Sequence, residues 1–253
     1  MTNRFEIRVL LTAVLFLAPI TGGLTTLVIV QEREKVMMSP DNDGFVEPAY
    51  LGWLINQTQK SLVTIDCNGL IGSGFSFELD SYDRGNGFSY HDIETEQAKS
   101  IVITNHHVVK ECIKENEIMV RTSIDESSIG NLKKLDELND LALLTIDFEV
   151  PPLVGSDNQP FPGYWTMALG SPHGFEGSVT FGNVINLDEK RVFHTASLSP
   201  GNSGGPLVDN EGLLIGVNTG SKPVGQNFNI SIGVNSFCDV LIKCRQERYW
   251  SSK

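Results

Sequence analysis

The sequence has little positive charge. Its 253 residues include 19 lysines and arginines against 31 aspartates and glutamates, which gives a formal net charge of −12. The basic residues form no stripe, so the electrostatic footprint expected of a nucleic-acid-binding protein is absent. Nucleic acid is therefore excluded as an expected partner.

Helical periodicity is scarce as well. From residue 47 onward, short apolar or alternating runs such as SLVTID, SIVITN and DLALLTIDF are separated by Gly, Pro, Asn or Asp. A helical spacing of apolar residues dominates only near the C-terminus, in VNSFCDVLIKCRQERYW. No internal repeat is evident. The pattern is typical of an all-β protein with many short strands, followed by one helix expected at residues 236–250.

The one long apolar run lies at the N-terminus. Residues 9–30 carry no charge, and as a helix they would span a hydrocarbon core of about 30 Å. Residues 1–30 are either an uncleaved signal anchor or a cleaved signal peptide, and the lack of an A-x-A cleavage site favours the anchor. Residues 31–46 are polar and predict a linker. The remaining domain, 47–253, is expected outside the cytoplasm.

Cysteines are few. An exported domain permits disulfides, and the sequence is compatible with either a bridge between Cys67 and Cys112 or buried thiols. Cys238 and Cys244 lie six residues apart in the expected helix, which places them on different faces. That geometry argues against a bridge between these two residues.

A serine flanked by glycines is the most specific local signal. PGNSGGPL, residues 200–207, contains Ser203. A nucleophilic serine needs a base within reach and backbone N–H groups that receive the developing oxyanion. Glycines let such N–H groups converge. A glycine-rich hairpin turn is the simpler alternative.

The same residues also fit the nucleophile elbow of α/β-hydrolases. In that fold the histidine follows the serine. All five histidines of this chain precede Ser203, namely His91, His106, His107, His173 and His194. The order His, Asp, Ser therefore remains. His173 and His194 are interpreted as structural or exposed, with a pH-sensitive role as the alternative.

TNHHVV, residues 104–109, offers two candidate bases. Neighbouring residues in an extended chain point to opposite sides, so only one of His106 and His107 can face the serine. Spacing alone does not say which. Asp140, in NDLALL, can accept from the imidazole Nδ1–H and leave Nε2 as base. Asp136 and Asp147 are the nearby alternatives.

Six motifs occur in the order found in HtrA/Deg serine proteases: GSGFSF, TNHHVV, NDLALLTID, ALGSPHGFEGSVTFGNV, PGNSGGPLVDNEGLLIGVNTG and SIGV. On these motifs, residues 47–250 resemble the protease domain of that family. The resemblance implies a chymotrypsin-like double β-barrel, with barrels at about 47–150 and 160–235. The family's base stands directly before VV, which assigns this role to His107. Asp140 and Ser203 complete the implied triad. The backbone amides of Gly201 and Ser203 form the implied oxyanion hole.

The resemblance also predicts a substrate class. The primary pocket is expected from Ser197, Leu198, Thr219 and Gly220, with Ser197 at its floor. A pocket for Lys or Arg would need a carboxylate there. We therefore expect cleavage of proteins or peptides after small or medium aliphatic residues. No metal or cofactor is implied.

Two departures from the family affect the functional expectation. The chain ends at Lys253 without the usual PDZ domain, and Thr195 replaces an aspartate in HTASLSP. The leading hypothesis is a serine endopeptidase for extracytoplasmic quality control, and a bacterial periplasm is its expected location. Its alternatives are a non-catalytic chaperone or binding module and a processing protease with one partner. A homotrimer is an expectation from the resemblance alone.

Overall fold

The computed structural model describes residues 44–78, 98–114, 117–124, 126–221 and 228–242. The chain divides into two units, Met1–Ser39 and Pro40–Lys253, and the described residues all belong to the second. The predicted membrane segment at 9–30 and most of the predicted linker thus lie outside them. In the described ranges, no helix is both long and apolar enough to cross a bilayer.

The first half of the domain is an open antiparallel sheet, which we call the half-barrel. Its strand order is β5-β4-β1-β2-β3-β7-β6, so β5 and β6 are its two edges. These edges follow each other along the chain through Gly130 and do not pair side by side. The first of the two expected barrels is therefore a half-barrel. Its strands are β1 (Leu62–Cys67), β2 (Leu70–Ser76), β3 (Ser100–Thr104), β4 (Ile118–Arg121), β5 (Ser127–Ile129), β6 (Asn131–Asp136) and β7 (Leu141–Ile146).

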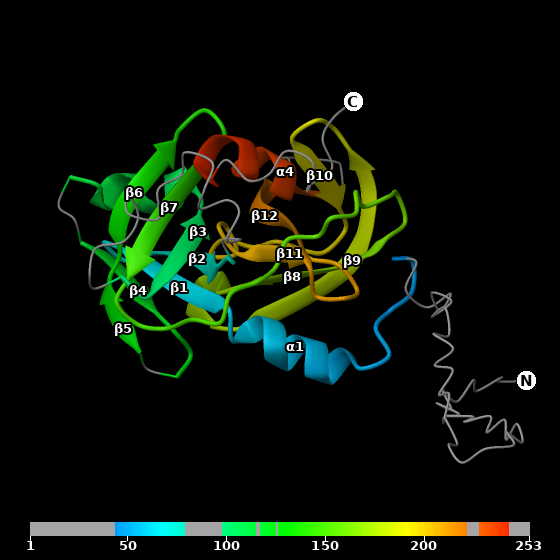
Figure 1. Cartoon of the computed structure of the whole chain (residues 1–253), viewed down its shortest axis with the longest axis horizontal. Coiled ribbons are helices and arrows are strands. Elements are labelled where there is room, and N and C mark those ends of the chain that lie inside the picture. Colours follow the sequence, from blue (N-terminus) through cyan, green and yellow to red (C-terminus); the bar gives the residue numbers. More distant parts are fainter. Residues whose placement is uncertain (1–43, 79–97, 115–116, 125, 222–227, 243–253) are drawn as a thin grey trace, which may run out of the picture. The chain divides into compact units, whose positions relative to one another are not determined.

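The second half is a closed six-stranded barrel. Its strands follow the order β10-β13-β12-β11-β8-β9, and β9 pairs with β10 to close it. The two sheets stand side by side in Figure 1, with the half-barrel on the left. The strands are β8 (Trp165–Gly170), β9 (Ser178–Leu187), β10 (Arg191–His194), β11 (Pro206–Val208), β12 (Leu214–Ser221) and β13 (Asn229–Gly233).

Short helices connect and flank the sheets. The described helices are α1 (Leu51–Gln59), α3 (His106–Val109), α4 (Val234–Phe237), the 3-10 turns η3 (Lys110–Cys112) and η4 (Pro172–Gly174), and the π-helix η5 (Cys238–Ile242). The expected C-terminal helix at 236–250 begins earlier, at Val234, and becomes a π-helix at Cys238; residues beyond Ile242 lie outside the described ranges. In Figure 1, α1 lies below the sheets and α4 above them.

The cysteines are oxidised. Cys67, at the end of β1, forms a disulfide with Cys112 in η3, with their Cα atoms 5.6 Å apart. Cys238 is disulfide-bonded as well, so the alternative of buried thiols is wrong. The argument against a bridge between Cys238 and Cys244 assumed a regular α-helix, whereas Cys238 begins a π-helix. The partner of Cys238 lies outside the described residues.

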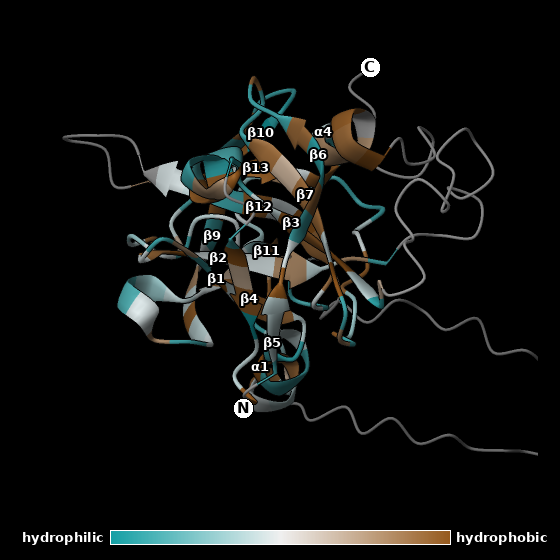
Figure 2. Cartoon of the chain, turned by 90° about the vertical axis from the view of Figure 1, so that its left-hand side faces the viewer, coloured by the Kyte–Doolittle hydropathy of each residue, from teal (hydrophilic) through white to brown (hydrophobic). Residues whose placement is uncertain are grey.

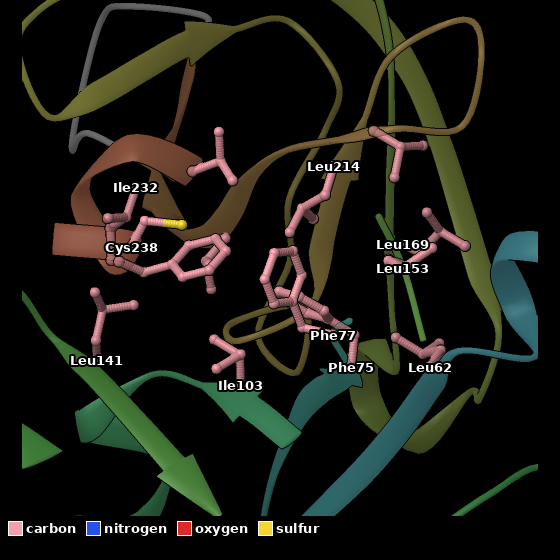
Figure 3. Close-up of a cluster of buried hydrophobic side chains, with 14 of the residues drawn as sticks. Leu62, Phe75, Phe77, Ile103, Leu141, Leu153, Leu169, Leu214, Ile232 and Cys238 are labelled. Carbon is pink, nitrogen blue, oxygen red and sulfur yellow. The ribbon is translucent and has the colours of Figure 1, made fainter. Parts of the chain in front are cut away.

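The core joins the two sheets. Apolar colour gathers on the strands in Figure 2 and polar colour on many connections. One buried cluster includes Phe75 and Ile103 of the half-barrel together with Leu169 and Leu214 of the closed barrel (Figure 3). Each such buried side chain stabilises the fold by roughly 1.5–3 kcal/mol. The shared cluster therefore fixes one sheet against the other at the seam where the candidate site lies.

Candidate active site

The two candidate histidines lie on one helical turn. β3 ends at Thr104, and α3 begins at His106. The spacing argument assumed an extended chain at these residues, and that assumption is wrong. Successive side chains on an α-helix diverge by about 100°, so the two imidazoles still point in different directions. His107 lines the pocket that contains Ser203, and His106 does not.

Asp140 faces His107 through both oxygens of its carboxylate. Oδ1 accepts the backbone N–H of His107 at 2.9 Å, and Oδ2 lies 2.8 Å from His107 Nδ1. A carboxylate acceptor requires Nδ1 to carry the proton, which leaves Nε2 as the basic nitrogen. The other two candidates do not make this contact, because Asp136 binds Asn139 and Asp147 is exposed.

The backbone of Asp140 is held in an uncommon conformation. Its φ is +54°, a region that Asp tolerates better than most residues with a Cβ. Asn105 Nδ2 donates to the Asp140 carbonyl at 2.9 Å and ties this turn to the start of α3. The carboxylate and the imidazole are thus fixed by backbone contacts as well as by each other.

Thr219, in β12, is the second partner of this carboxylate. Its Oγ1 donates to Asp140 Oδ2 at 2.6 Å. Burial raises the pKa of Asp140, but the hydrogen bonds from His107 and Thr219 outweigh burial and hold that pKa below 3.8. The sequence predicted Thr219 as a wall of the substrate pocket and missed this contact. No local sequence pattern signals this contact, because the two residues lie 79 positions apart.

Ser203 lies in a tight turn before β11. Gly201 and Gly204 have φ of +104° and +85°, which glycine adopts without strain. A Cβ on Gly201 would collide with the carbonyl of Ser171, and a Cβ on Gly204 with the carbonyl of Ser73. The turn is therefore wedged between the β8–β9 connection and the half-barrel, where only glycines fit at these two positions.

The turn presents two backbone N–H groups without a protein acceptor among the described residues, those of Gly201 and Ser203. The carbonyl in the same peptide as the Gly201 N–H belongs to Pro200 and accepts from the His173 N–H at 3.0 Å. The carbonyl of Asn202 accepts from the Gly205 N–H at 3.0 Å. In a trans peptide the N–H points opposite to the carbonyl. Both N–H groups thus point away from these internal donors.

The serine hydroxyl and the imidazole share one pocket but not a hydrogen bond. Ser203 Oγ donates to the Thr219 carbonyl at 3.4 Å, and among the described residues no hydrogen bond joins it to His107. Both residues line a pocket of about 650 Å³. Catalytic hydrogen bonds are often long or misaligned without substrate and tighten in the complex.

The pocket is mainly apolar near Ser203. Two residues of the predicted substrate pocket, Leu198 and Gly220, line it together with Ser199 and Pro200. Ser197 does not, because its side chain is exposed and its carbonyl accepts from Thr180 Oγ1 at 2.8 Å. The described part of the lining contains no carboxylate.

The remaining described histidines differ in environment. His173 is exposed, lines the pocket and has a φ of +52°. His194 is fully buried, with Nε2 3.0 Å from Ser231 Oγ, and burial lowers its pKa to about 4. In the described ranges, no group of three or more His, Cys, Asp or Glu could hold a metal ion.

Comparison with known proteins identifies the family. The model of the trypsin-like peptidase domain matches residues 85–217. The chain belongs to the trypsin-like peptidase family. The serine protease HhoB of Synechocystis sp. is 31% identical over 151 residues, which cover 53% of this chain and 35% of the relative. A DegP-like periplasmic serine endoprotease of Rickettsia prowazekii is 27% identical over 236 residues, 87% of this chain and 43% of the relative.

This trypsin-like peptidase is thus homologous to the HtrA/DegP-like serine endoproteases, and the resemblance drawn from its motifs is confirmed. The chain spans less than half the length of these two relatives. The serine endoprotease of Yersinia pestis has a similar structure, with a TM-score of 0.63 and 24% identity over 78% of this chain and 66% of that one. This likeness shows a shared chymotrypsin-like fold.

Proposed function

We propose that this trypsin-like peptidase is an active serine endopeptidase with Ser203 as nucleophile, His107 as general base and Asp140 as the orienting carboxylate. The observation that carries the proposal is the double contact of Asp140 with the N–H and Nδ1 of His107. It leaves Nε2 as the basic nitrogen of a ring that lines the same pocket as Ser203.

In the proposed reaction, Ser203 Oγ attacks the carbonyl carbon of the scissile peptide while His107 Nε2 takes the hydroxyl proton. The Asp140 carboxylate stabilises the imidazolium. The N–H groups of Gly201 and Ser203 donate to the oxyanion; losing one such donor typically costs about 100- to 1000-fold in rate. The intermediate then expels the amine, which takes the proton from His107. Water hydrolyses the acyl-enzyme by the same steps and restores Ser203.

The proposed substrates are protein chains cut after small or medium aliphatic residues. The apolar lining around Leu198 and the lack of a carboxylate in the described part of the pocket support this preference. A peptide library cleaved by the full chain should show Val, Ala or Ile before the cut. Dominant cleavage after Lys, Arg or Glu would contradict it.

The proposed setting is extracytoplasmic. It is supported by the apolar segment at residues 9–30 and by the oxidised cysteines. The Rickettsia relative is itself described as periplasmic. Membrane anchoring, protein quality control and a homotrimer remain predictions from the sequence.

Active-site labelling with a fluorophosphonate tests the proposed triad. The wild-type chain is compared with Ser203→Ala, His107→Ala and the matched control His106→Ala. We expect labelling of the wild type and of His106→Ala only, because His106 lies outside the pocket. An unlabelled wild type would overturn the proposal and favour the non-catalytic binding module.

A further inference from the structure

Ser73 lies in β2 of the half-barrel, directly behind the turn that carries Ser203, and it is fully buried. Its hydroxyl donates to the Gly201 carbonyl at 2.6 Å and accepts from the Ser171 N–H at 2.9 Å. Its backbone N–H donates to the Ser203 carbonyl at 2.8 Å. One residue of the half-barrel thus holds two carbonyls of a turn that belongs to the other half of the domain.

These contacts complete the support of the turn. Four successive carbonyls, those of Pro200, Gly201, Asn202 and Ser203, each accept one hydrogen bond. The first and third accept from N–H groups of the closed-barrel half, and the second and fourth accept from Ser73. Support for the peptides therefore alternates between the two halves of the domain.

We propose that Ser73 is a positioning residue for the oxyanion site. The Gly201–Asn202 peptide links the two N–H groups that would receive the oxyanion, and the Ser73 hydroxyl fixes how that peptide is turned. A hydroxyl has a single hydrogen to donate, and here it is committed to the Gly201 carbonyl. On the other side of this peptide, the Asn202 N–H donates to the Ser199 carbonyl at 2.9 Å. Glycine at position 201 itself offers little resistance to rotation, so the orientation depends on these two bonds, and the Ser73 hydroxyl supplies one of them. The inference rests on the proposed protease activity.

Loss of the hydroxyl would act on the transition state more than on the bound substrate. Without it, the Gly201 carbonyl loses its donor and the Ser171 N–H its acceptor. The Gly201–Asn202 peptide would then be held on one side only, and the Gly201 and Ser203 N–H groups that it links would be less firmly placed relative to each other. Interactions made only in the transition state change kcat and the affinity for tetrahedral analogues, and they leave KM nearly constant.

Thr64 provides a matched control. It lies directly opposite Ser73 in the register of β1 and β2, and it is equally buried, with its Oγ1 2.6 Å from Ser171 Oγ. Thr64→Val removes a buried hydroxyl from the same layer without touching the Ser203 turn. It therefore shows how much kcat, KM and boronate affinity change when a buried polar contact near Ser73, but not to the Ser203 turn, is lost.

The test measures kcat and KM on a peptide with an aliphatic residue before the cut, together with inhibition by a boronate of matching sequence. For Ser73→Ala in the full chain, we expect kcat to fall about 10- to 100-fold, somewhat less than for loss of an oxyanion donor itself. Boronate affinity should fall by a similar factor, while KM changes less than about threefold. Thr64→Val should leave all three values within about threefold.

An unchanged kcat in Ser73→Ala, or equal losses in Ser73→Ala and Thr64→Val, would overturn the inference. Should Ser73→Ala show no cooperative melting, Ser73→Cys replaces it, because the slightly larger thiol fills the space of the hydroxyl but donates only weakly. A wild-type kcat in that variant would also overturn the inference. An inactive wild type would instead overturn the proposed function, so the two failures are distinguishable.

Discussion

The half-barrel and the closed barrel secure their parts of the site by different means. His107 and Asp140 lie just outside strands of the half-barrel. The Asp140 carboxylate contacts the N–H and Nδ1 of His107, and Asn105 holds the Asp140 carbonyl. Ser203 lies in a turn whose carbonyls are each bonded to a backbone or hydroxyl donor. The contacts at the open sheet therefore depend on a few polar side chains, whereas the turn that carries Ser203 depends mainly on backbone geometry that glycines permit.

Two carboxylates show the same contrast. Asp140 receives hydrogen bonds from His107 and Thr219 that outweigh its burial and lower its pKa. Asp209, at the turn after β11, is only 9% exposed, and burial raises its pKa to about 6 despite two backbone donors. The hydrogen bonds at the half-barrel keep Asp140 charged, while the closed barrel buries Asp209 at a cost in stability.

Asp140→Asn should have the largest effect on activity, because it disrupts the contact between Asp140 and His107 beside the half-barrel. The amide cannot serve as a charged acceptor for both the N–H and Nδ1 of His107, so the ring loses the tautomer that presents Nε2. We expect kcat to fall about 10⁴-fold with little change in KM, measured by steady-state hydrolysis of an aliphatic peptide. Asp136→Asn is the control, because its carboxylate contacts Asn139. A loss below tenfold in Asp140→Asn would show that this carboxylate does not orient the base.

The contrast also explains what the sequence could predict. Ser203 and its glycines form a local pattern, because the turn itself requires glycine at positions 201 and 204. The choice of His107 over His106 came only from the family resemblance. The spacing argument assumed an extended chain, and the residues form a helical turn.

Other features depend on tertiary contacts that no local pattern encodes. Nothing near Thr219 in the sequence reveals that its hydroxyl reaches Asp140, 79 residues away. The hydrogen bond from Ser73 to the Gly201 carbonyl, 128 residues away, is equally invisible in the local sequence. Whether the first sheet closes depends on how its edges β5 and β6 are placed, and strand patterns do not specify this.

Asp209→Asn tests the closed barrel's carboxylate through its pH dependence. With a folded pKa near 6 against an ordinary value of 3.8, the folded state binds more protons than the unfolded state between these pH values. The free energy of unfolding therefore falls as pH rises through this window. The amide keeps the acceptor oxygen for the Glu211 and Leu213 N–H groups and never ionises. We expect Asp209→Asn to be more stable than the wild type at pH 7, by up to about 3 kcal/mol.

Denaturant unfolding of the two chains at pH 4 and pH 7 measures this effect. His194 also makes stability depend on pH, because its buried neutral ring lowers stability as pH drops from 6.5 toward about 4. This contribution is the same in both chains and cancels in the difference between them. The advantage of Asp209→Asn should shrink toward zero at pH 4. An equal difference at both pH values would show that Asp209 is not the titrating group.

Thr219→Val has the smallest expected effect of these three variants. It tests directly the hydrogen bond that joins the closed barrel to Asp140. Thr219 belongs to the closed barrel, yet its hydroxyl donates to the half-barrel's Asp140. Valine keeps the shape and the backbone carbonyl that accepts from Ser203 Oγ, and it removes only the hydroxyl. Losing a hydrogen bond to a charged group costs roughly 1.5–3 kcal/mol, but the two contacts from His107 remain. We therefore expect kcat to fall about tenfold, with KM and the preferred residue before the cut unchanged. A shift in that preference with constant kcat would mean that Thr219 is a pocket wall, as the sequence predicted, and that its hydroxyl does not help to position Asp140.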